Sequence, residues 1–104
     1  MARSKRLESG FQDNLCDRLE FTFPGCFITK LDTSYKQGIP DLLILFDMKW
    51  AILECKESAS AKHQPNQDDY VEMFDYMSFS RFIYPENEDR VIGELYNYFM
   101  YGER

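Results

Sequence analysis

Apolar residues follow a helical period at the start of the chain. In residues 4–20 they recur every four positions and would form one buried stripe on a helix. The residues of this stripe are Leu7, Phe11, Leu15 and Leu19. After the turn signal Pro24-Gly25, residues 26–31 form a short, bounded segment that is rich in strand-compatible side chains. A helix followed by a strand is therefore expected.

The next segments predict a pair of strands. Residues 32–38 are polar and predict a loop, whereas residues 41–46 form a nearly continuous apolar run that follows Pro40. Such a run predicts a central strand that is buried on both faces. Residues 47–49 suit a hairpin connection, so residues 50–56 predict the next strand, antiparallel to its neighbour.

The remaining segments predict a helix, a strand and a helix. Residues 57–65 are small and polar, as in a mobile loop, and Asn66 is a candidate cap for a helix that ends near residue 78. Residues 81–84 predict a short strand, and residues 86–100 a final helix with acidic first turns. The order α-β-β-β-α-β-α predicts one α/β domain over residues 1–104, with a central mixed sheet flanked by helices.

Composition supports a packed, globular chain. Hydrophobic residues make up 44% of the 104 residues, enough for one core. The three cysteines form no CxxC pair or zinc-ligand cluster, and we expect reduced, mostly buried thiols. No apolar segment approaches the roughly 18 residues that span a bilayer. We expect a soluble, intracellular, cytoplasmic protein with no membrane partner.

The charge is distributed unevenly along the chain. The formal net charge of −6 argues against nucleic-acid binding when taken as an average. However, residues 1–62 carry nine Lys/Arg and nine Asp/Glu, whereas residues 63–104 carry three Lys/Arg and nine Asp/Glu. The first part can present a basic face to DNA if the acidic part faces away. Candidate phosphate contacts, each of which is alternatively a solvated surface residue, are Lys5, Arg6, Lys30, Lys36 and Lys62.

The chemistry of the chain is concentrated at the ends of the two predicted neighbouring strands. Glu54 and Lys56 would project to the same side of one strand, and Asp41 at the start of the other can lie beside them. Two carboxylates aimed at one point suit a Mg²⁺ or Mn²⁺ ion. Alternatively, Asp41 caps a turn while Glu54 and Lys56 form a solvent-facing ion pair. The abrupt change from the apolar residues 50–53 to Glu-x-Lys favours the metal site.

Other candidate residues are assigned structural roles. His63 stands alone in a polar loop without a partner at ligand spacing, and is interpreted as a surface residue or at most a phosphate contact. Two groups of apolar residues in the last two helices are interpreted as core or dimer interface. They are Tyr70, Phe74 and Met77 in the first helix, and Tyr96, Phe99 and Met100 in the second.

The spacing of the charged residues resembles that of a known superfamily. Pro40-Asp41, a spacer of twelve residues and Glu54-Cys55-Lys56 are similar to the bipartite motif of the PD-(D/E)xK nucleases. The sequence resembles in particular the VRR-NUC group and the small Holliday-junction resolvases. The flanks agree, because Glu8 would match a metal-ligand Glu of the first helix and Gln67 a Gln of the helix after the motif.

The resemblance implies a restriction-endonuclease-like core and a divalent-metal site. Glu8, Asp41, Glu54 and the backbone carbonyl of Cys55 would bind Mg²⁺ or Mn²⁺, Lys56 would position the attacking water, and Gln67 would support the site. The implied activity is a metal-dependent DNA endonuclease that selects branched DNA such as a four-way junction and acts as a homodimer. Its small size would suit a phage-encoded enzyme acting in a host cell. The alternatives are a nicking or general nuclease, or a non-catalytic module that binds DNA or protein.

Overall fold

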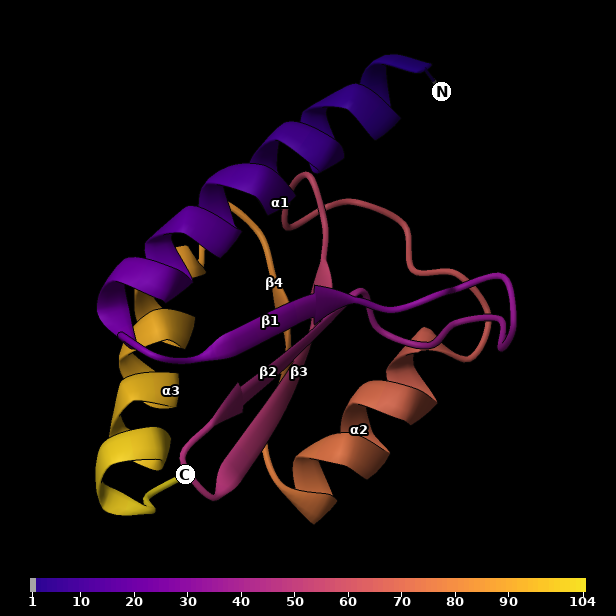
Figure 1. Cartoon of the computed structure of the whole chain (residues 1–104). Coiled ribbons are helices and arrows are strands. Elements are labelled where there is room, and N and C mark those ends of the chain that lie inside the picture. The colour runs from indigo at the N-terminus through magenta and orange to yellow at the C-terminus, as the bar shows by residue number, and fades with distance from the viewer. Residues whose placement is uncertain (1) are drawn as a thin grey trace.

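The predicted order of elements is confirmed by a computed structural model that describes the backbone of residues 2–104 and the side chains of residues 9–104 (Figure 1). The helices and strands are α1 (Ala2–Thr22), β1 (Phe27–Lys30), β2 (Leu42–Phe46), β3 (Lys49–Cys55), α2 (Gln67–Met77), β4 (Ser80–Ile83) and α3 (Glu88–Tyr101). The boundaries differ from the predicted ones by one or two residues at most ends.

The four strands form one mixed sheet in the order β1-β2-β3-β4. β2 is antiparallel to both β1 and β3, joined to β1 by the loop of residues 31–41 and to β3 by a tight hairpin. The β2–β3 hairpin turns at Asp47 and Met48, where Asp47 has a left-handed φ of 57°. β4 follows the crossover through α2 and is therefore parallel to β3. The predicted mixed sheet is confirmed.

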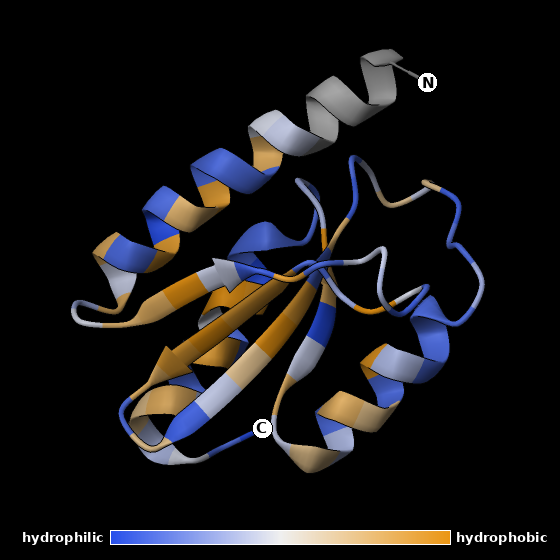
Figure 2. Ribbon diagram, turned by 45° about the vertical axis from the view of Figure 1, so that its right-hand side comes forward, coloured by the Kyte–Doolittle hydropathy of each residue, from blue (hydrophilic) through white to orange (hydrophobic). Residues whose placement is uncertain are grey.

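Two helices cover one face of the sheet and one helix covers the other (Figure 1). α1 and α3 pack on the face that holds the main hydrophobic core, where Leu15, Leu19 and Leu95 are fully buried. The predicted stripe of α1 is thus confirmed at Leu15 and Leu19, and Phe11 is partly buried beside them. The side chain of Leu7 lies outside the described residues. Figure 2 shows the apolar strands enclosed by these helices and the polar loops gathered at one end of the sheet.

The prediction that residues 41–46 are buried on both faces is wrong. Leu42 and Ile44 are fully buried, whereas Leu45 is 42% exposed. The reason lies in the position of α2, which packs on β3 and β4 and leaves the same face of β1 and β2 uncovered. The strand with continuous burial is β3, in which residues 51–55 are all buried.

The second helix is anchored differently from the sequence prediction. Asn66 occupies the cap position with a left-handed φ of 73°, and its side chain makes no cap hydrogen bond. Its amide instead donates to the carbonyl of Gln37, at 3.4 Å. Phe74 packs edge-on against Trp50, with ring centroids 6.1 Å apart, but Met77 remains 58% exposed. The predicted apolar stripe of α2 is therefore only partly covered.

The cysteines and the final helix modify two further expectations. Cys55 is buried, but Cys16 and Cys26, which form no disulfide among the described residues, are only half-buried. In α3, Phe99 belongs to the core whereas Tyr96 and Met100 are about two-fifths exposed, at 40% and 38%. Within the part of the chain that the structure describes, no helix is long and apolar enough to cross a membrane.

Candidate active site

Asp41 and Glu54 lie side by side because of the strand register. Leu42 pairs with Leu53 in the antiparallel β2–β3 ladder, so the preceding Asp41 is opposite Glu54 and on the same face of the sheet. Asp41 is fixed by its backbone, whose N–H donates to the carbonyl of Leu53 at 3.0 Å. Its carboxylate oxygen Oδ2 accepts a hydrogen bond from the backbone N–H of Cys55, at 2.8 Å.

The electrostatic environment of Asp41 is dominated by burial. Loss of solvent raises the pKa of the Asp41 carboxyl above its ordinary value. The hydrogen bond from Cys55, a side-chain hydrogen bond with Glu54 and the positive charges of Lys56 and Lys30 act in the opposite direction. A cation bound next to this carboxyl would favour its ionised form and so act against the effect of burial.

Glu54 and Lys56 form a buried charged pair. Only 3% of Glu54 and 5% of Lys56 are exposed, and Glu54 Oε2 lies 3.8 Å from Lys56 Nζ. The alternative of a solvent-facing ion pair at a strand end is therefore wrong. Lysine and glutamate are almost never buried this completely unless they are paired, because desolvation of a charge is costly. Lys56 Nζ also donates a hydrogen bond to the backbone carbonyl of Lys62, at 3.1 Å.

Gln67 connects Glu54 to the loop before α2. Its amide nitrogen donates to Glu54 Oε2 at 2.9 Å, and its amide oxygen accepts from the backbone N–H of Gln64 at 2.7 Å. With 8% exposure, Gln67 is the buried residue of α2 and not an exposed helix residue. The first residue of this helix therefore holds the orientation of the Glu54 carboxylate.

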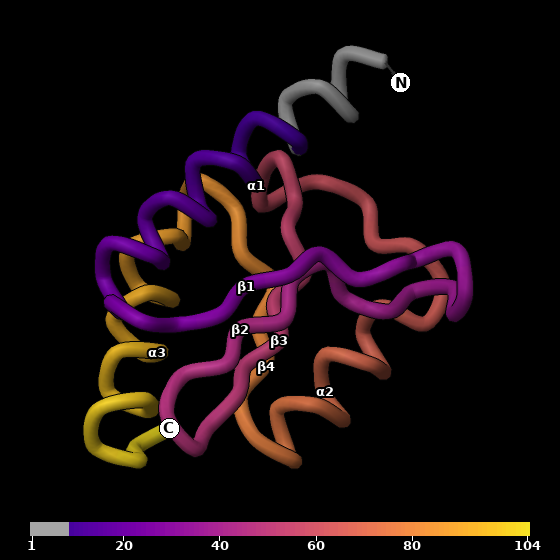
Figure 3. Tube along the Cα trace, in the orientation of Figure 1, coloured from indigo at the N-terminus to yellow at the C-terminus, as the bar shows by residue number. Residues whose placement is uncertain are grey.

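Two loops lie together next to these charged residues. Figure 3 shows the loop of residues 31–40 meeting the later part of the segment 57–66 near the start of α2. Gly38 has a φ of +91°, and a Cβ atom there would come within 2.5 Å of the Pro65 carbonyl oxygen. The contact between the loops is therefore too close for a side chain at residue 38.

His63 has partners that its position in the sequence does not reveal. Its Nδ1 lies 2.6 Å from Asp68 Oδ1, and its ring stacks on Phe82 with centroids 4.0 Å apart. Phe82 pairs with Glu54 in the β3–β4 register, so the imidazole is near the charged pair. His63 is exposed, as predicted for a surface residue, but it is not isolated, because Asp68 and Phe82 contact its ring. No periodic pattern could have shown this, because the contacts join a loop, a helix and a strand.

The predicted phosphate contacts are only partly brought together. Lys30 pairs with Asp13 at 3.2 Å, Lys36 lies over the ring of Tyr35, and Lys62 is exposed beside the loop contact with Lys56. The side chains of Lys5 and Arg6, like that of the predicted metal ligand Glu8, lie outside the described residues.

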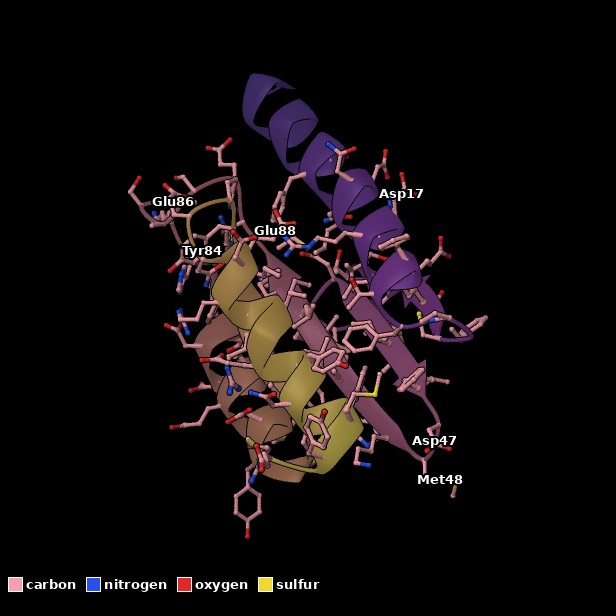
Figure 4. The ribbon with its side chains drawn as sticks, turned by 90° about the vertical axis from the view of Figure 1, so that its left-hand side faces the viewer. Asp17, Asp47, Met48, Tyr84, Glu86 and Glu88 are labelled. Atoms are coloured by element: carbon pink, nitrogen blue, oxygen red, sulfur yellow. The ribbon has the colours of Figure 1, made fainter. Side chains whose placement is uncertain are left out.

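The acidic C-terminal part does not simply face away from this region. Asp68 and Asp69 share a surface depression with Lys62 and His63. By contrast, the acidic side chains of α3 are largely neutralised elsewhere, because Arg18 binds Glu88 and Asp89 at 2.8 Å each. Figure 4 shows Glu86 and Glu88 near one end of the molecule and the hairpin residues Asp47 and Met48 at the other.

The described side chains do not by themselves complete a metal site. Among residues 9–104, no group of three or more His, Cys, Asp or Glu side chains is placed to hold a metal ion. Asp41 and Glu54 supply two carboxylates at one point, and the predicted third carboxylate, Glu8, is outside this part of the chain.

Comparisons with known proteins show the fold. No protein-family model matches the sequence, and no curated protein matches it either. A solved structure described as a "VRR_NUC domain protein" is similar, with a TM-score of 0.58 and 18% sequence identity. The similarity covers 84% of this chain and 85% of the other. The predicted restriction-endonuclease-like α/β core is thereby confirmed.

Proposed function

We propose that the chain is a metal-dependent DNA endonuclease of the PD-(D/E)xK type, with Asp41, Glu54 and Lys56 as its catalytic residues. The observation that carries the proposal is the buried pair of Glu54 and Lys56 beside Asp41, at the end of two paired strands. A buried ion pair usually adds little to the stability of a fold, because desolvation of the charges is costly. An active site therefore accounts better for the burial of Glu54 and Lys56. The fold supports the proposal, because the similar solved protein is named for a VRR_NUC domain.

The donor atoms at the site fit Mg²⁺ or Mn²⁺. Both ions prefer hard oxygen ligands, which Asp41 and Glu54 supply together. Burial raises the pKa of the Asp41 carboxyl, and a cation bound beside it would lower that pKa by stabilising the ionised carboxylate. We infer that the Cys55 carbonyl and Glu8 complete the ligand set. When bound, the ion would polarise the scissile phosphate and lower the pKa of a bound water.

The residues of the chain itself orient and stabilise the reacting groups. The Lys62 carbonyl and Glu54 hold the Lys56 ammonium in one position, from which it would orient the attacking water and offset negative charge on the phosphate. Gln67 fixes the Glu54 carboxylate in the orientation needed for a ligand. Hydrolysis in this arrangement would leave 5′-phosphate and 3′-hydroxyl ends.

We infer that the substrate is branched DNA and that the enzyme acts as a homodimer. A chain of 104 residues is small beside a four-way junction, and two copies would supply one active site for each of two strands. Exposed apolar side chains on α3 offer a surface for the second copy, with Tyr101 67% exposed and Tyr96 40% exposed. Analytical ultracentrifugation tests the homodimer directly, because a monomer at micromolar concentration would contradict the proposed dimer.

The proposed activity is tested by cleavage of a labelled four-way junction, a linear duplex and a single strand, each with Mg²⁺ or Mn²⁺. The variants are Glu54→Gln and Lys56→Met, which keep the size of each side chain and remove its charge. Asp47→Asn and Lys49→Met are the matched controls, because Asp47 lies in the hairpin at the far end of the sheet and Lys49 follows it (Figure 4).

Metal-dependent cleavage by the wild type and both controls, with loss of cleavage in both site variants, is the expected result. Preference for the junction supports the branched substrate, and equal cleavage of all three substrates indicates a general nuclease. If the wild type binds DNA with either metal but never cuts it, the proposal fails and a binding module replaces it.

A further inference from the structure

An exposed tyrosine projects from the loop that ends at the proposed active site. Tyr35 is 83% exposed and lies in the connection between β1 and β2, six residues before Asp41. The backbone N–H of Leu31 donates to the carbonyl of Asp41 at 2.8 Å, so the loop leaves the sheet and returns to it beside the catalytic carboxylate. Tyr35 therefore lies in a loop whose two ends are joined beside the proposed site.

Hydrogen bonds and packing constrain this loop. The N–H of Tyr35 donates to the Asp32 carbonyl at 3.3 Å, and the N–H of Ile39 donates to the Lys36 carbonyl at 3.1 Å. Further along, Gly38 packs against the Pro65 carbonyl of the neighbouring loop. Two turns within the loop and one contact with the neighbouring loop order its backbone, so its aromatic side chain loses less conformational entropy on binding than it would in a free loop.

The surroundings of the ring are suited to nucleic acid. The Lys36 ammonium lies 5.3 Å from the centroid of the Tyr35 ring and can reach a neighbouring phosphate. Tyr35 is 83% exposed, so the face of the ring opposite the Lys36 ammonium is open to a ligand. Aromatic side chains combined with cations are the usual means of binding unpaired bases, because every base has a flat face that can stack.

We propose that Tyr35 stacks on an unpaired base next to the cut, while Lys36 contacts the adjoining phosphate. The inference rests on the proposed nuclease function and specifies its substrate. A fully paired duplex buries the faces of its bases in the stack, whereas a branch point or a single strand exposes them. Tyr35 would thus favour DNA that is unstacked at the scissile position.

The test compares three variants by fluorescence anisotropy, with Ca²⁺ in place of Mg²⁺ so that binding is measured without cleavage. Tyr35→Ala removes the ring, and Tyr35→Phe keeps it. Tyr76→Ala is the matched control, since Tyr76 is also an exposed tyrosine, at 85%, but lies on α2. The DNA substrates are a four-way junction and a single strand, each with 2-aminopurine next to the expected cut, and an unbranched duplex.

The expected result is a Kd for the junction and the single strand that rises by about 5- to 150-fold in Tyr35→Ala. The Kd for the duplex stays unchanged, and Tyr35→Phe and Tyr76→Ala resemble the wild type. The 2-aminopurine fluorescence is quenched by the wild type and by Tyr35→Phe, and the quenching is lost in Tyr35→Ala.

Two results would overturn the inference while leaving the nuclease intact. One is an unchanged Kd for every substrate in Tyr35→Ala, and the other is an equal loss for duplex and junction. A wild type that neither binds nor cleaves any of the three substrates would overturn the proposed function as well, so the two failures can be told apart.

Discussion

Replacement of Gln67 by leucine isolates the contribution of the amide that joins Glu54 to the loop before α2. Leucine has a similar volume, so the change removes polar contacts without opening a large cavity. Two hydrogen bonds are lost, at 2.9 Å to a charged carboxylate and at 2.7 Å from a backbone N–H. A hydrogen bond to a charged group contributes about 1.5–3 kcal/mol and a neutral one about 0.5–1.5 kcal/mol.

The sum predicts a loss of about 2–4.5 kcal/mol in the free energy of unfolding of Gln67→Leu. Because Gln67 is 8% exposed, water can replace these bonds only in part. For a domain of this size, each 1 kcal/mol lowers the Tm by about 4–8 °C. Urea denaturation followed by circular dichroism measures the change, and a thermal scan checks it.

Gln64→Leu is the matched control for this experiment. Gln64 is the same residue type three positions earlier, its side chain is exposed, and its backbone N–H is unaffected by the substitution. The control should retain the stability of the wild type within about 0.5 kcal/mol. Equal stability of the two variants would refute the reasoning, because it would mean that the buried amide contributes no net free energy.

Three further predictions concern other parts of the chain. Gly38→Ala should lower the free energy of unfolding by about 1–3 kcal/mol, because residue 38 has a φ of +91° and its Cβ would meet the Pro65 carbonyl. Gly10→Ala in the open part of α1 should be neutral or stabilising. Urea denaturation that ranks the two variants in the reverse order would contradict this prediction. Phe23→Ala should lower the free energy of unfolding by about 3–5 kcal/mol, because the ring is fully buried. Its centroid lies 5.5 Å from that of Phe46 and 5.1 Å from that of Phe99. A Tm close to that of the wild type in calorimetry would contradict this prediction. Burial raises the pKa of the Cys16 and Cys26 thiols, so a smaller fraction of each is thiolate at pH 8 in the folded protein. Iodoacetamide should therefore label these thiols more slowly in the folded protein than after unfolding. Equal labelling rates by mass spectrometry would show that the thiols are not perturbed.

The same thiols predict a direction for alkaline stability. The pKa of both thiols is higher in the folded chain than in the unfolded chain, and this difference stabilises the folded state. The stabilisation is complete below the ordinary thiol pKa of about 9 and is lost as the pH rises through the pKa of the folded state. Serine replacement at both positions should reduce this decline, which chemical denaturation at pH 8 and pH 10 would detect.

Local patterns in the sequence determined the order of the elements and the central charged residues. Alternation along a strand places Glu54 and Lys56 on one side. The sequence predicted a connection at residues 47–49, and the two-residue turn of the structure sets the register that brings Asp41 opposite Glu54. These relations depend only on residues close together along the chain. The helical stripe at Leu15 and Leu19 is predictable for the same reason, because it follows from the helical period alone.

Only the tertiary structure decided which surfaces are covered and which distant residues meet. The position of α2 leaves Leu45 exposed on β2 and buries Gln67 against Glu54. It also carries the loop at residue 65 against Gly38. No periodic pattern in the sequence predicts these contacts. Each one depends on how a helix packs on the sheet. The candidate site thus takes its charged residues from the local pattern, and their burial and orientation from the packing of α2 and the loop before it.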